Sequence, residues 1–321
     1  MKKLLLILMC LSCLFLVSGC GSNKTETKSE GIKLEYTPTL QKYGFKEPVN
    51  LKKYPERVIS LVHTPVLALH ELGVSQVGVP ANRLYAWPEE LKKVKQFNMG
   101  MKANFDLESV VASKPDLVIL PYQYRDKYGK QLEKEKIPVY YVDAGPTVPY
   151  GSVKELVDVL IKAFGKDKAK ADALHKRFTD CEVKMAASQK ANANKKVMVL
   201  NSAPPSHYLQ TENGTIGNMA KHLGFKNVFA SDKGTMVLMD REAVLSYNPD
   251  VILCAGMGKT PEEQQKIMEA DFTKNATYWN QIKAIKEKKI IYLPIQFNVS
   301  TGIKVVENIE YIDKALKEKG F

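Results

Sequence analysis

Two histidines occupy positions from which an imidazole could coordinate a bound metal. His63 directly follows a mostly apolar run at residues 58–62, and His207 follows the apolar run at 197–200 after a Pro-Pro turn. In parallel α/β folds, the loops at the carboxyl ends of such strands line the ligand site. Because neutral imidazole ligates metals and haem iron, we expect His63 and His207 to face each other across a site. The alternative is that each is an ordinary hydrogen-bonding loop residue.

Aromatic residues lie near the same predicted loops. Tyr85 and Trp87 follow one predicted strand, and Tyr122 follows the next. Tyr208 lies beside His207. Aromatic faces stack on large flat ligands, so these four side chains are candidate ligand contacts. The alternative is packing at the rim or in the core.

The chain lacks the short motifs with which enzymes perform covalent or phosphoryl chemistry. It has no nucleophile elbow, no Walker-type glycine loop, no His-Glu-x-x-His helix and no paired cysteine motif. We therefore expect a binding protein that is not an enzyme and has no catalytic cofactor.

One structural unit occurs twice in the sequence. Asp-Leu-Glu-Ser-Val-Val at 106–111 leads to Lys-Pro-Asp and an apolar run ending at 120, and Asp-Arg-Glu-Ala-Val-Leu at 240–245 leads to Asn-Pro-Asp and an apolar run ending at 253. Each copy predicts a short helix capped by aspartate, a Pro-Asp turn and a buried strand. Short Val- and Ile-rich runs alternate with amphipathic stretches elsewhere too, as in βα units around parallel sheets. The two copies indicate two lobes of similar construction.

The residues between the copies predict the connection between these lobes. Apolar residues recur at three- and four-residue spacing within residues 152–164 and 168–189, as in long helices. The predicted fold is α/β, with two Rossmann-like lobes joined by a long helical spine and a ligand cleft between them. The predicted N-terminal lobe is 51–148, the spine 149–194 and the C-terminal lobe 195–321. A helical spine predicts little closure on binding.

The N-terminal residues predict export and anchoring. Lysines precede a short apolar run, and Val-Ser-Gly-Cys at 17–20 resembles the lipobox of bacterial lipoproteins, in which the cysteine is lipidated. Residues 1–19 form the predicted signal peptide, and residues 20–50 the predicted tether, beginning at lipidated Cys20. We expect an extracytoplasmic protein that is lipid-anchored to the outer face of the cell membrane.

The net charge argues against one class of partner, and the remaining cysteines leave one structural question open. The 321-residue chain has a formal net charge of +12, which becomes +10 without the two signal lysines. The remaining lysines are scattered along polar helix faces and no nucleic-acid motif accompanies them, so we expect no nucleic-acid partner. Cys181 and Cys254 leave one disulfide open as an alternative.

From residue 55 onward the sequence resembles the ABC-importer receptors that bind cobalamin, ferric siderophores and haem. Pro-Glu-Arg-Val-Ile-Ser-Leu at 55–61 matches the opening strand of that family, and Glu-Leu-Gly-Val with Val-Gly-Val-Pro at 71–80 matches its next unit. The C-terminal lobe most resembles Gram-positive haem-receptor lipoproteins. The residues that carry this likeness are Ile252, Cys254, Pro261, Glu262, Met268, Phe272, Asn275, Trp279, Pro294 and Phe297.

The resemblance implies partners for the two repeated helices. In the family, one glutamate on each lobe docks into basic pockets of an ABC permease dimer that works with an ATPase, and the matching positions are Glu108 and Glu242. A carboxylate at the start of a surface helix can pair with arginine across an interface. The alternative is that each carboxylate complements its helix dipole. The receptor itself is expected to be a monomer that carries one small molecule.

The resemblance also favours haem as that small molecule. Haem requires axial ligands, an apolar slot and polar groups for its propionates. Met101 matches the family's axial methionine, whereas the family's Ala-His-Gly turn is Ala-Gly-Met-Gly at 255–258, so Met257 is the nearest substitute for the missing histidine. We expect haem iron to be held by Met101 and Met257, although methionine also fills apolar gaps. Alternatives are a ferric siderophore or cobalamin receptor and, in other classes, a zinc or manganese receptor or a surface scaffold.

Overall fold

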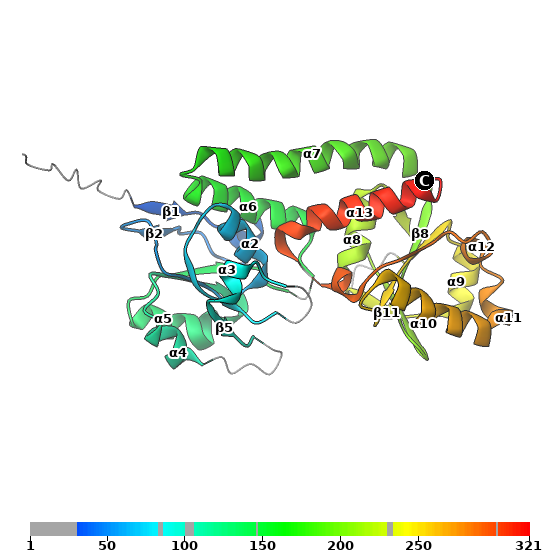
Figure 1. Cartoon of the computed structure of the whole chain (residues 1–321), viewed down its shortest axis with the longest axis horizontal. Helices are drawn as coiled ribbons and strands as arrows, with labels where there is room; N and C mark the ends of the chain where they lie inside the picture. Colours follow the sequence, from blue (N-terminus) through cyan, green and yellow to red (C-terminus); the bar gives the residue numbers. More distant parts are fainter. Residues whose placement is uncertain (1–30, 83–85, 100–105, 146, 230–233, 300) are drawn as a thin grey trace, which may run out of the picture.

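The chain forms two α/β lobes joined by helices, as Figure 1 shows. This computed structural model describes residues 31–321 except 83–85, 100–105, 146, 230–233 and 300. The predicted signal peptide and Cys20 therefore lie outside the described residues.

The N-terminal lobe contains a five-stranded parallel sheet in the order β5-β4-β3-β6-β7. Its strands are β3 (Val58–Ser60), β4 (Gln76–Pro80), β5 (Lys95–Phe97), β6 (Leu117–Pro121) and β7 (Val139–Val142). The accompanying helices are α2 (His63–Glu71), α3 (Glu89–Lys92), α4 (Leu107–Ala112) and α5 (Lys130–Lys134), with η1 (Tyr122–Tyr124) and η2 (Arg125–Gly129) between β6 and α5. Every residue of β3, β6 and β7 is buried, because both faces of a parallel sheet are covered.

A segment that the sequence analysis placed in the flexible tether is part of this lobe. It contains β1 (Ile32–Leu34), α1 (Pro38–Lys42) and β2 (Val49–Leu51), and β1 pairs with β2 in an antiparallel ladder. Leu34 is fully buried, and the ring of Tyr36 stacks on Tyr140 of β7 at 5.0 Å. The tether predicted over residues 20–50 is therefore too long, because the apolar side chains after residue 31 pack on the sheet.

The C-terminal lobe contains a six-stranded mixed sheet in the order β11-β9-β8-β12-β13, with β10 beside β8. Its strands are β8 (Lys196–Ala203), β9 (Ser206–Gln210), β10 (Lys226–Asn227), β11 (Met236–Leu238), β12 (Val251–Gly256) and β13 (Ile290–Tyr292). Its helices are α8 (Thr215–His222), α9 (Arg241–Tyr247), α10 (Pro261–Lys274), α11 (Ala276–Trp279) and α12 (Lys283–Lys286). β8, β12, β13 and β10 are parallel, whereas β9 and β11 are antiparallel additions at one edge.

The repeated unit has the same construction in both lobes. Asp106 accepts a hydrogen bond from Ser109 N at the start of α4, and Asp240 accepts from Glu242 N and Ala243 N at the start of α9. The aspartates of the two Pro-Asp turns are also equivalent. Asp116 accepts from Arg57 N and Asp250 from Lys196 N, where the first strand of each lobe begins. The predicted α/β fold with two similar lobes is confirmed.

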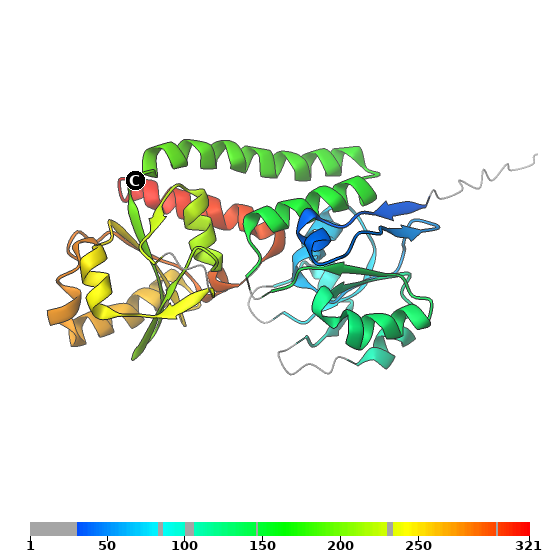
Figure 2. The same cartoon turned by 180° about the vertical axis from the view of Figure 1, so that it is seen from behind.

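Two segments connect the lobes. α7 (Lys168–Asn192) extends over both lobes in the views of Figures 1 and 2, whereas α6 (Tyr150–Phe164) packs on α2 and β1 of the N-terminal lobe. The chain returns through η3 (Ile295–Asn298) and η4 (Gly302–Lys304), which contacts α2, before α13 (Val305–Glu318) runs beside α7. The helical spine is thus α7 with α13, and α6 belongs to the N-terminal lobe.

The hydrophobic core is divided by the sheet of the C-terminal lobe. One face of this sheet, here called the inner face, carries Val197, Val199, Val251 and Leu253, which belong to the same cluster as the core of the N-terminal lobe. The opposite or outer face carries Met198, Leu200, Ile252 and Cys254 and forms a separate cluster with Trp279. Cys181 and Cys254 are buried in different clusters and are free thiols.

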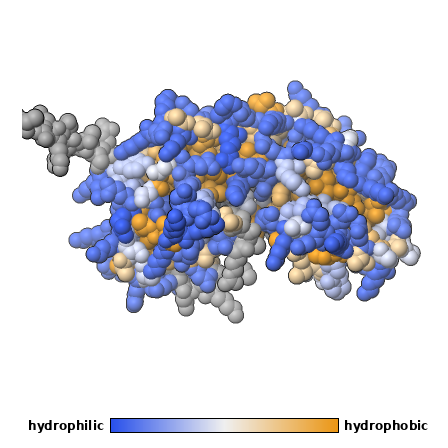
Figure 3. All heavy atoms as spheres, viewed as in Figure 1, coloured by the Kyte–Doolittle hydropathy of each residue, from blue (hydrophilic) through white to orange (hydrophobic). Residues whose placement is uncertain are grey.

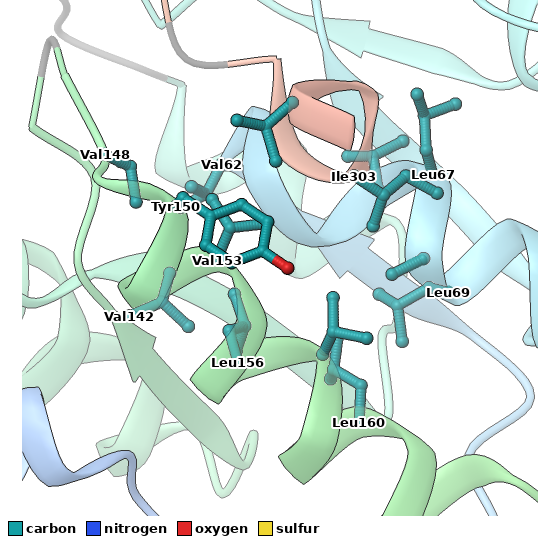
Figure 4. Close-up of a cluster of buried hydrophobic side chains, with 14 of the residues drawn as sticks. Val62, Leu67, Leu69, Val142, Val148, Tyr150, Val153, Leu156, Leu160 and Ile303 are labelled. Atoms are coloured by element: carbon teal, nitrogen blue, oxygen red, sulfur yellow. The ribbon is translucent and has the colours of Figure 1, made fainter. Parts of the chain in front are cut away.

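Ile303 of η4 joins the two lobes through the larger cluster. Figure 4 shows its side chain among Leu67 of α2 and Tyr150 and Val153 of α6. The surface is mainly hydrophilic, with hydrophobic areas interspersed, in the view of Figure 3. No helix among the described residues has the length and apolar character needed to cross a membrane.

Candidate functional site

His63 lies at the carboxyl end of the first strand, as predicted. It is the first residue of α2, and its Nε2 is 3.3 Å from the carbonyl oxygen of Ala81, which follows β4. Trp87 is buried, donates from Nε1 to Pro80 O at 3.0 Å, and stacks on the His63 ring at 5.8 Å. Burial lowers the pKa of His63 below its usual value, while the Ala81 carbonyl raises it. Burial thus favours the neutral form of the imidazole, which is the form that binds metals.

His207 lies elsewhere than predicted. It belongs to the antiparallel strand β9 and its side chain packs on the outer face, where its ring contacts Trp279 edge-on at 5.3 Å. Only 4% of the residue is exposed. Its Nδ1 is 2.9 Å from Ser202 Oγ and its Nε2 is 3.3 Å from Asp271 Oδ2. The predicted facing pair of His63 and His207 is wrong, because His207 is enclosed in the outer core.

Tyr208 lies on the opposite side of the same strand. Successive residues of a strand point to opposite faces, so Tyr208 is on the inner face, and it is 42% exposed. Two neighbouring apolar residues that the sequence analysis missed share this face, Met236 and Leu238 of β11. Their only sequence signal was a Met-Val-Leu run beside Gly234 and Thr235, which is too short to distinguish an edge strand from a loop.

Tyr122 packs against the N-terminal segment. Its ring stacks on Tyr43 at 4.8 Å and meets Phe45 edge-on at 6.2 Å. One face of the Tyr122 ring is therefore occupied by the chain itself, and its predicted contact with a ligand remains a prediction.

Met257 is available for contact with a ligand. It follows β12, is 66% exposed, and lies in a loop held by a hydrogen bond from Gly258 N to the buried Gln264 Oε1. Ile295 N donates to Gly258 O and fixes the other side of this loop. Met101 and Tyr85 lie outside the described residues.

The predicted docking glutamates occupy equivalent exposed positions. Glu108 lies in the first turn of α4 and Glu242 in the first turn of α9, each two residues after the capping aspartate of its helix. Figure 1 shows α4 and α9 on different lobes. Each lobe therefore presents one of these two carboxylates to solvent.

The described part of the chain contains no group of three or more His, Cys, Asp or Glu side chains arranged to hold a metal ion. Of the donors predicted for the ligand site, the imidazole of His63 lies beside Trp87 in the N-terminal lobe, and the thioether of Met257 is exposed after β12 in the C-terminal lobe. An imidazole and a thioether are suitable ligands for a metal that is already bound within a largely apolar organic molecule.

The chain is similar to known proteins in both sequence and fold. The family model described as Periplasmic binding protein matches residues 58–296. The chain is 24% identical to the uncharacterised ABC transporter substrate-binding lipoprotein YvrC of Bacillus subtilis, with 94% of this chain and 93% of that protein covered. It is 26% identical to the petrobactin-binding protein YclQ of Bacillus subtilis, with 91% of each chain covered. It is 25% identical to the high-affinity heme uptake system protein IsdE of Staphylococcus aureus, with 77% of this chain and 82% of that protein covered.

Two of these relatives have solved structures with the same fold. The YclQ crystal structure gives a TM-score of 0.66 at 20% identity and covers 90% of this chain and 99% of that chain. The structure of IsdE complexed with heme gives 0.59 at 23% identity and covers 81% and 98%. Because the family model spans most of the sequence, the chain belongs to the Periplasmic binding protein family, and the predicted resemblance to ABC-importer receptors is confirmed.

Proposed function

We propose that the protein is the substrate-binding receptor of an ABC importer for an iron-containing ligand, with haem as the preferred cargo. The observation that carries this proposal is family membership across residues 58–296, together with similarity to a heme uptake protein and a petrobactin-binding protein. The relatives are named for binding and uptake, so the protein delivers its ligand and is not an enzyme. A ferric siderophore or cobalamin is the alternative cargo.

The donors in the two lobes favour haem over the alternatives. The His63 ring stacks on Trp87, and burial favours its neutral form by lowering its pKa. Met257 presents an exposed thioether after β12. Met101 and Met257 are the proposed pair of ligands to haem iron, and His63 is the alternative nitrogen donor in place of one of them. Imidazole and thioether are ligands of haem iron, whereas ferric siderophores supply all of the ligands to their own iron.

The proposed lipid anchor, tether and membrane partners follow from the proposed export of the protein. Cys20 is the proposed site of lipidation, and the residues before Ile32 are the proposed tether to the outer face of the cell membrane. The receptor is a proposed monomer whose partners are an ABC permease dimer and its ATPase. In this proposal, both lobes contact the permease at the same time, because each lobe presents one of the two glutamates.

Haemin titration tests the cargo. The mature chain is expected to give a Soret band with haemin, and Met257→Leu is expected to shift that band and weaken binding at least ten-fold, because leucine preserves volume without a sulfur donor. Met219→Leu, a change in the buried core on α8, is the matched control. A chain that binds cyanocobalamin or a ferric tris-catecholate complex but not haemin would contradict the haem assignment and favour the alternative.

Replacement of the two glutamates tests docking. Glu108→Gln with Glu242→Gln is expected to abolish ligand uptake by cells while ligand affinity in solution stays within two-fold, because both side chains are exposed and lie on surface helices. Glu133→Gln with Glu263→Gln removes one exposed charge from each lobe at other helices and serves as the control. Uptake that survives the first pair of changes would show that these carboxylates do not dock.

A further inference from the structure

The inner face of the C-terminal sheet is covered over only part of its length. Val197 and Val199, in the first half of β8, are buried beneath neighbouring helices. Toward the far end of the sheet, the same face carries Tyr208, Met236 and Leu238, which are 42%, 44% and 68% exposed. Large apolar side chains gathered on one exposed surface commonly mark a site of interaction.

The strand register places these side chains together. Tyr208 pairs with Leu238 across the antiparallel ladder of β9 and β11, and Met236 pairs with Gln210 in the same ladder. Directly opposed side chains in such a ladder point to the same face and contact each other. On the other side of β9, Tyr208 pairs with Asn201, whose Nδ2 donates to Met236 Sδ at 3.1 Å. This weak hydrogen bond holds the Met236 thioether against the sheet, beside Tyr208.

Gln210 marks the boundary between the covered and the exposed parts. It is 1% exposed, and its Oε1 accepts a hydrogen bond from Ile216 N at the start of α8. Its Nε2 donates to Asn298 Oδ1 at 2.7 Å. Asn298 ends η3, and the following η4 contacts α2 of the N-terminal lobe, which begins at His63. The exposed part of the inner face therefore borders the junction between the lobes rather than the outer surface of the molecule.

We propose that Tyr208, Met236 and Leu238 form an apolar wall on which a flat, largely apolar ring system of the ligand lies. This inference rests on the proposed function and adds the chemical class that the C-terminal lobe selects. An aromatic ring, a thioether and an aliphatic side chain gain free energy by covering apolar ring surface. An anionic catecholate or hydroxamate shell would find no charged partner among Tyr208, Met236, Leu238 and Asn201, and burying that charge would be costly. The wall therefore favours ligands by the apolar surface of their ring system and not by the metal that the ring holds.

Paired serine substitutions test the wall with a closely matched control. The wall variant is Tyr208→Ser with Leu238→Ser. The control is Tyr311→Ser on α13 with Val183→Ser on α7, since these side chains are 43% and 72% exposed and the two variants therefore remove similar apolar surface. Circular dichroism checks that both fold. The full mature chain and both variants are titrated with haemin, metal-free protoporphyrin, a ferric tris-catecholate complex and cyanocobalamin.

The wild-type chain and the control are expected to bind haemin and metal-free protoporphyrin. The wall variant is expected to lose at least ten-fold in affinity for both porphyrins, because the interaction is with the ring. Unchanged porphyrin affinity in the wall variant overturns the wall and leaves the receptor function standing. Binding of only the tris-catecholate complex also overturns the wall and supports the alternative cargo. If none of the four ligands binds, the cargo class fails together with the wall. If the wall variant alone converts a wild-type dimer to a monomer in sedimentation, the surface is an interface between copies and the proposal is wrong.

Discussion

His207 is a buried imidazole whose surroundings disfavour its charged form. Burial lowers the pKa of His207 below its usual value, and the nearby Arg241 acts in the same direction, whereas Asp271 opposes the shift. In the neutral tautomer with its proton on Nε2, that proton would face Asp271 and Nδ1 would accept from the Ser202 hydroxyl. Asp271 Oδ2 also accepts from Trp279 Nε1 at 2.8 Å. Burial in the outer core therefore favours the uncharged form of His207.

This arrangement predicts that acid destabilises the fold in a defined pH range. The unfolded chain binds a proton at His207 near the ordinary histidine pKa of about 6.5, but the folded chain binds it only at lower pH, so the free energy of unfolding falls as pH decreases below about 6.5. Urea unfolding between pH 7.5 and 5 should show this decline. His207→Gln should lower stability at pH 7.5 and reduce the decline, whereas His175→Gln, at an exposed position on α7, should change neither. An unaltered decline in His207→Gln would show that other groups cause it.

The two predicted histidines show what a sequence reveals about single residues. His63 was placed correctly because the apolar run before it forms a buried parallel strand that ends where the run ends. His207 was misplaced because the chain reverses after Ala203 and continues as the antiparallel strand β9. Alternation along β9 then separates His207 from Tyr208, so only one of these neighbours can lie on the inner face. The residues that pair with them, Ser202 and Asn201, are close in sequence. The sequence of β8 and β9 does not show, however, in which register the two strands pair.

At the scale of elements, η4 depends on a glycine at the junction of the lobes. Gly302 has φ +58°, and a Cβ at this position would lie 2.4 Å from Thr64 O of α2. Gly302→Ala is therefore expected to impose both a strained backbone conformation and a steric clash, lowering the free energy of unfolding by about 3 kcal/mol or more. Thermal and urea unfolding would measure this loss.

Gly320 provides the matched control for this substitution. Its φ is +85°, but a Cβ there would meet no atom within 4 Å. Gly320→Ala should therefore cost only the backbone strain, about 1 kcal/mol. Equal losses in the two variants would mean that the contact of Gly302 with α2 contributes nothing to stability.

The sequence predicted elements best where their signals are local. The aspartate cap, the short helix, the Pro-Asp turn and the buried strand all lie within about 15 residues in each copy, and both copies formed as predicted. The segment from β1 to β2 was missed because its strands are short and its stability comes from distant partners such as Tyr140. Burial against residues far along the chain leaves little periodic signal in the segment itself.

At the scale of the whole molecule, the two lobes are joined more extensively than a single spine would allow. The sequence predicted the spine over residues 149–194 from the periodicity of residues 152–164 and 168–189. The second segment is α7, which extends over both lobes, whereas the first is α6, which packs on the N-terminal lobe. The sequence did not predict the return crossing, because η3 and η4 are single turns without a repeating pattern. Tyr150 N of α6 also donates to Asn218 Oδ1 of α8 at 3.0 Å. Both lobes also share one hydrophobic cluster. This cluster and the contacts between the lobes together favour a stiff hinge.

Arg177 of α7 contacts three other elements at this junction, α2, η4 and α13. Its Nη1 lies 2.8 Å from Glu71 Oε1 of α2, and its Nη2 lies 2.6 Å from Glu307 Oε1 of α13. The same Nη2 donates to Ile303 O of η4 at 3.2 Å. Burial lowers the pKa of Arg177, but Glu307 and Glu71 outweigh this effect and raise it, so the guanidinium remains charged. A single side chain thus holds the spine, the return crossing and the N-terminal lobe together.

Arg177→Met is expected to loosen the orientation of the lobes and to lower the free energy of unfolding by about 2 kcal/mol, because two carboxylates and a carbonyl lose a partly buried donor. Spin labels on Lys134→Cys of α5 and Lys274→Cys of α10 would report the distance between the lobes as a broader distribution in this variant. In a chain that begins after Cys20, the introduced thiols can be labelled selectively, since Cys181 and Cys254 are buried and burial raises the pKa of each to about 12. Lys184→Met removes the exposed ion pair with Glu310, which joins α7 and α13 without touching the N-terminal lobe, and should leave the distribution unchanged at a cost below about 1 kcal/mol. A distribution as narrow in Arg177→Met as in Lys184→Met would mean that the shared core alone, and not the arginine, sets the angle between the lobes.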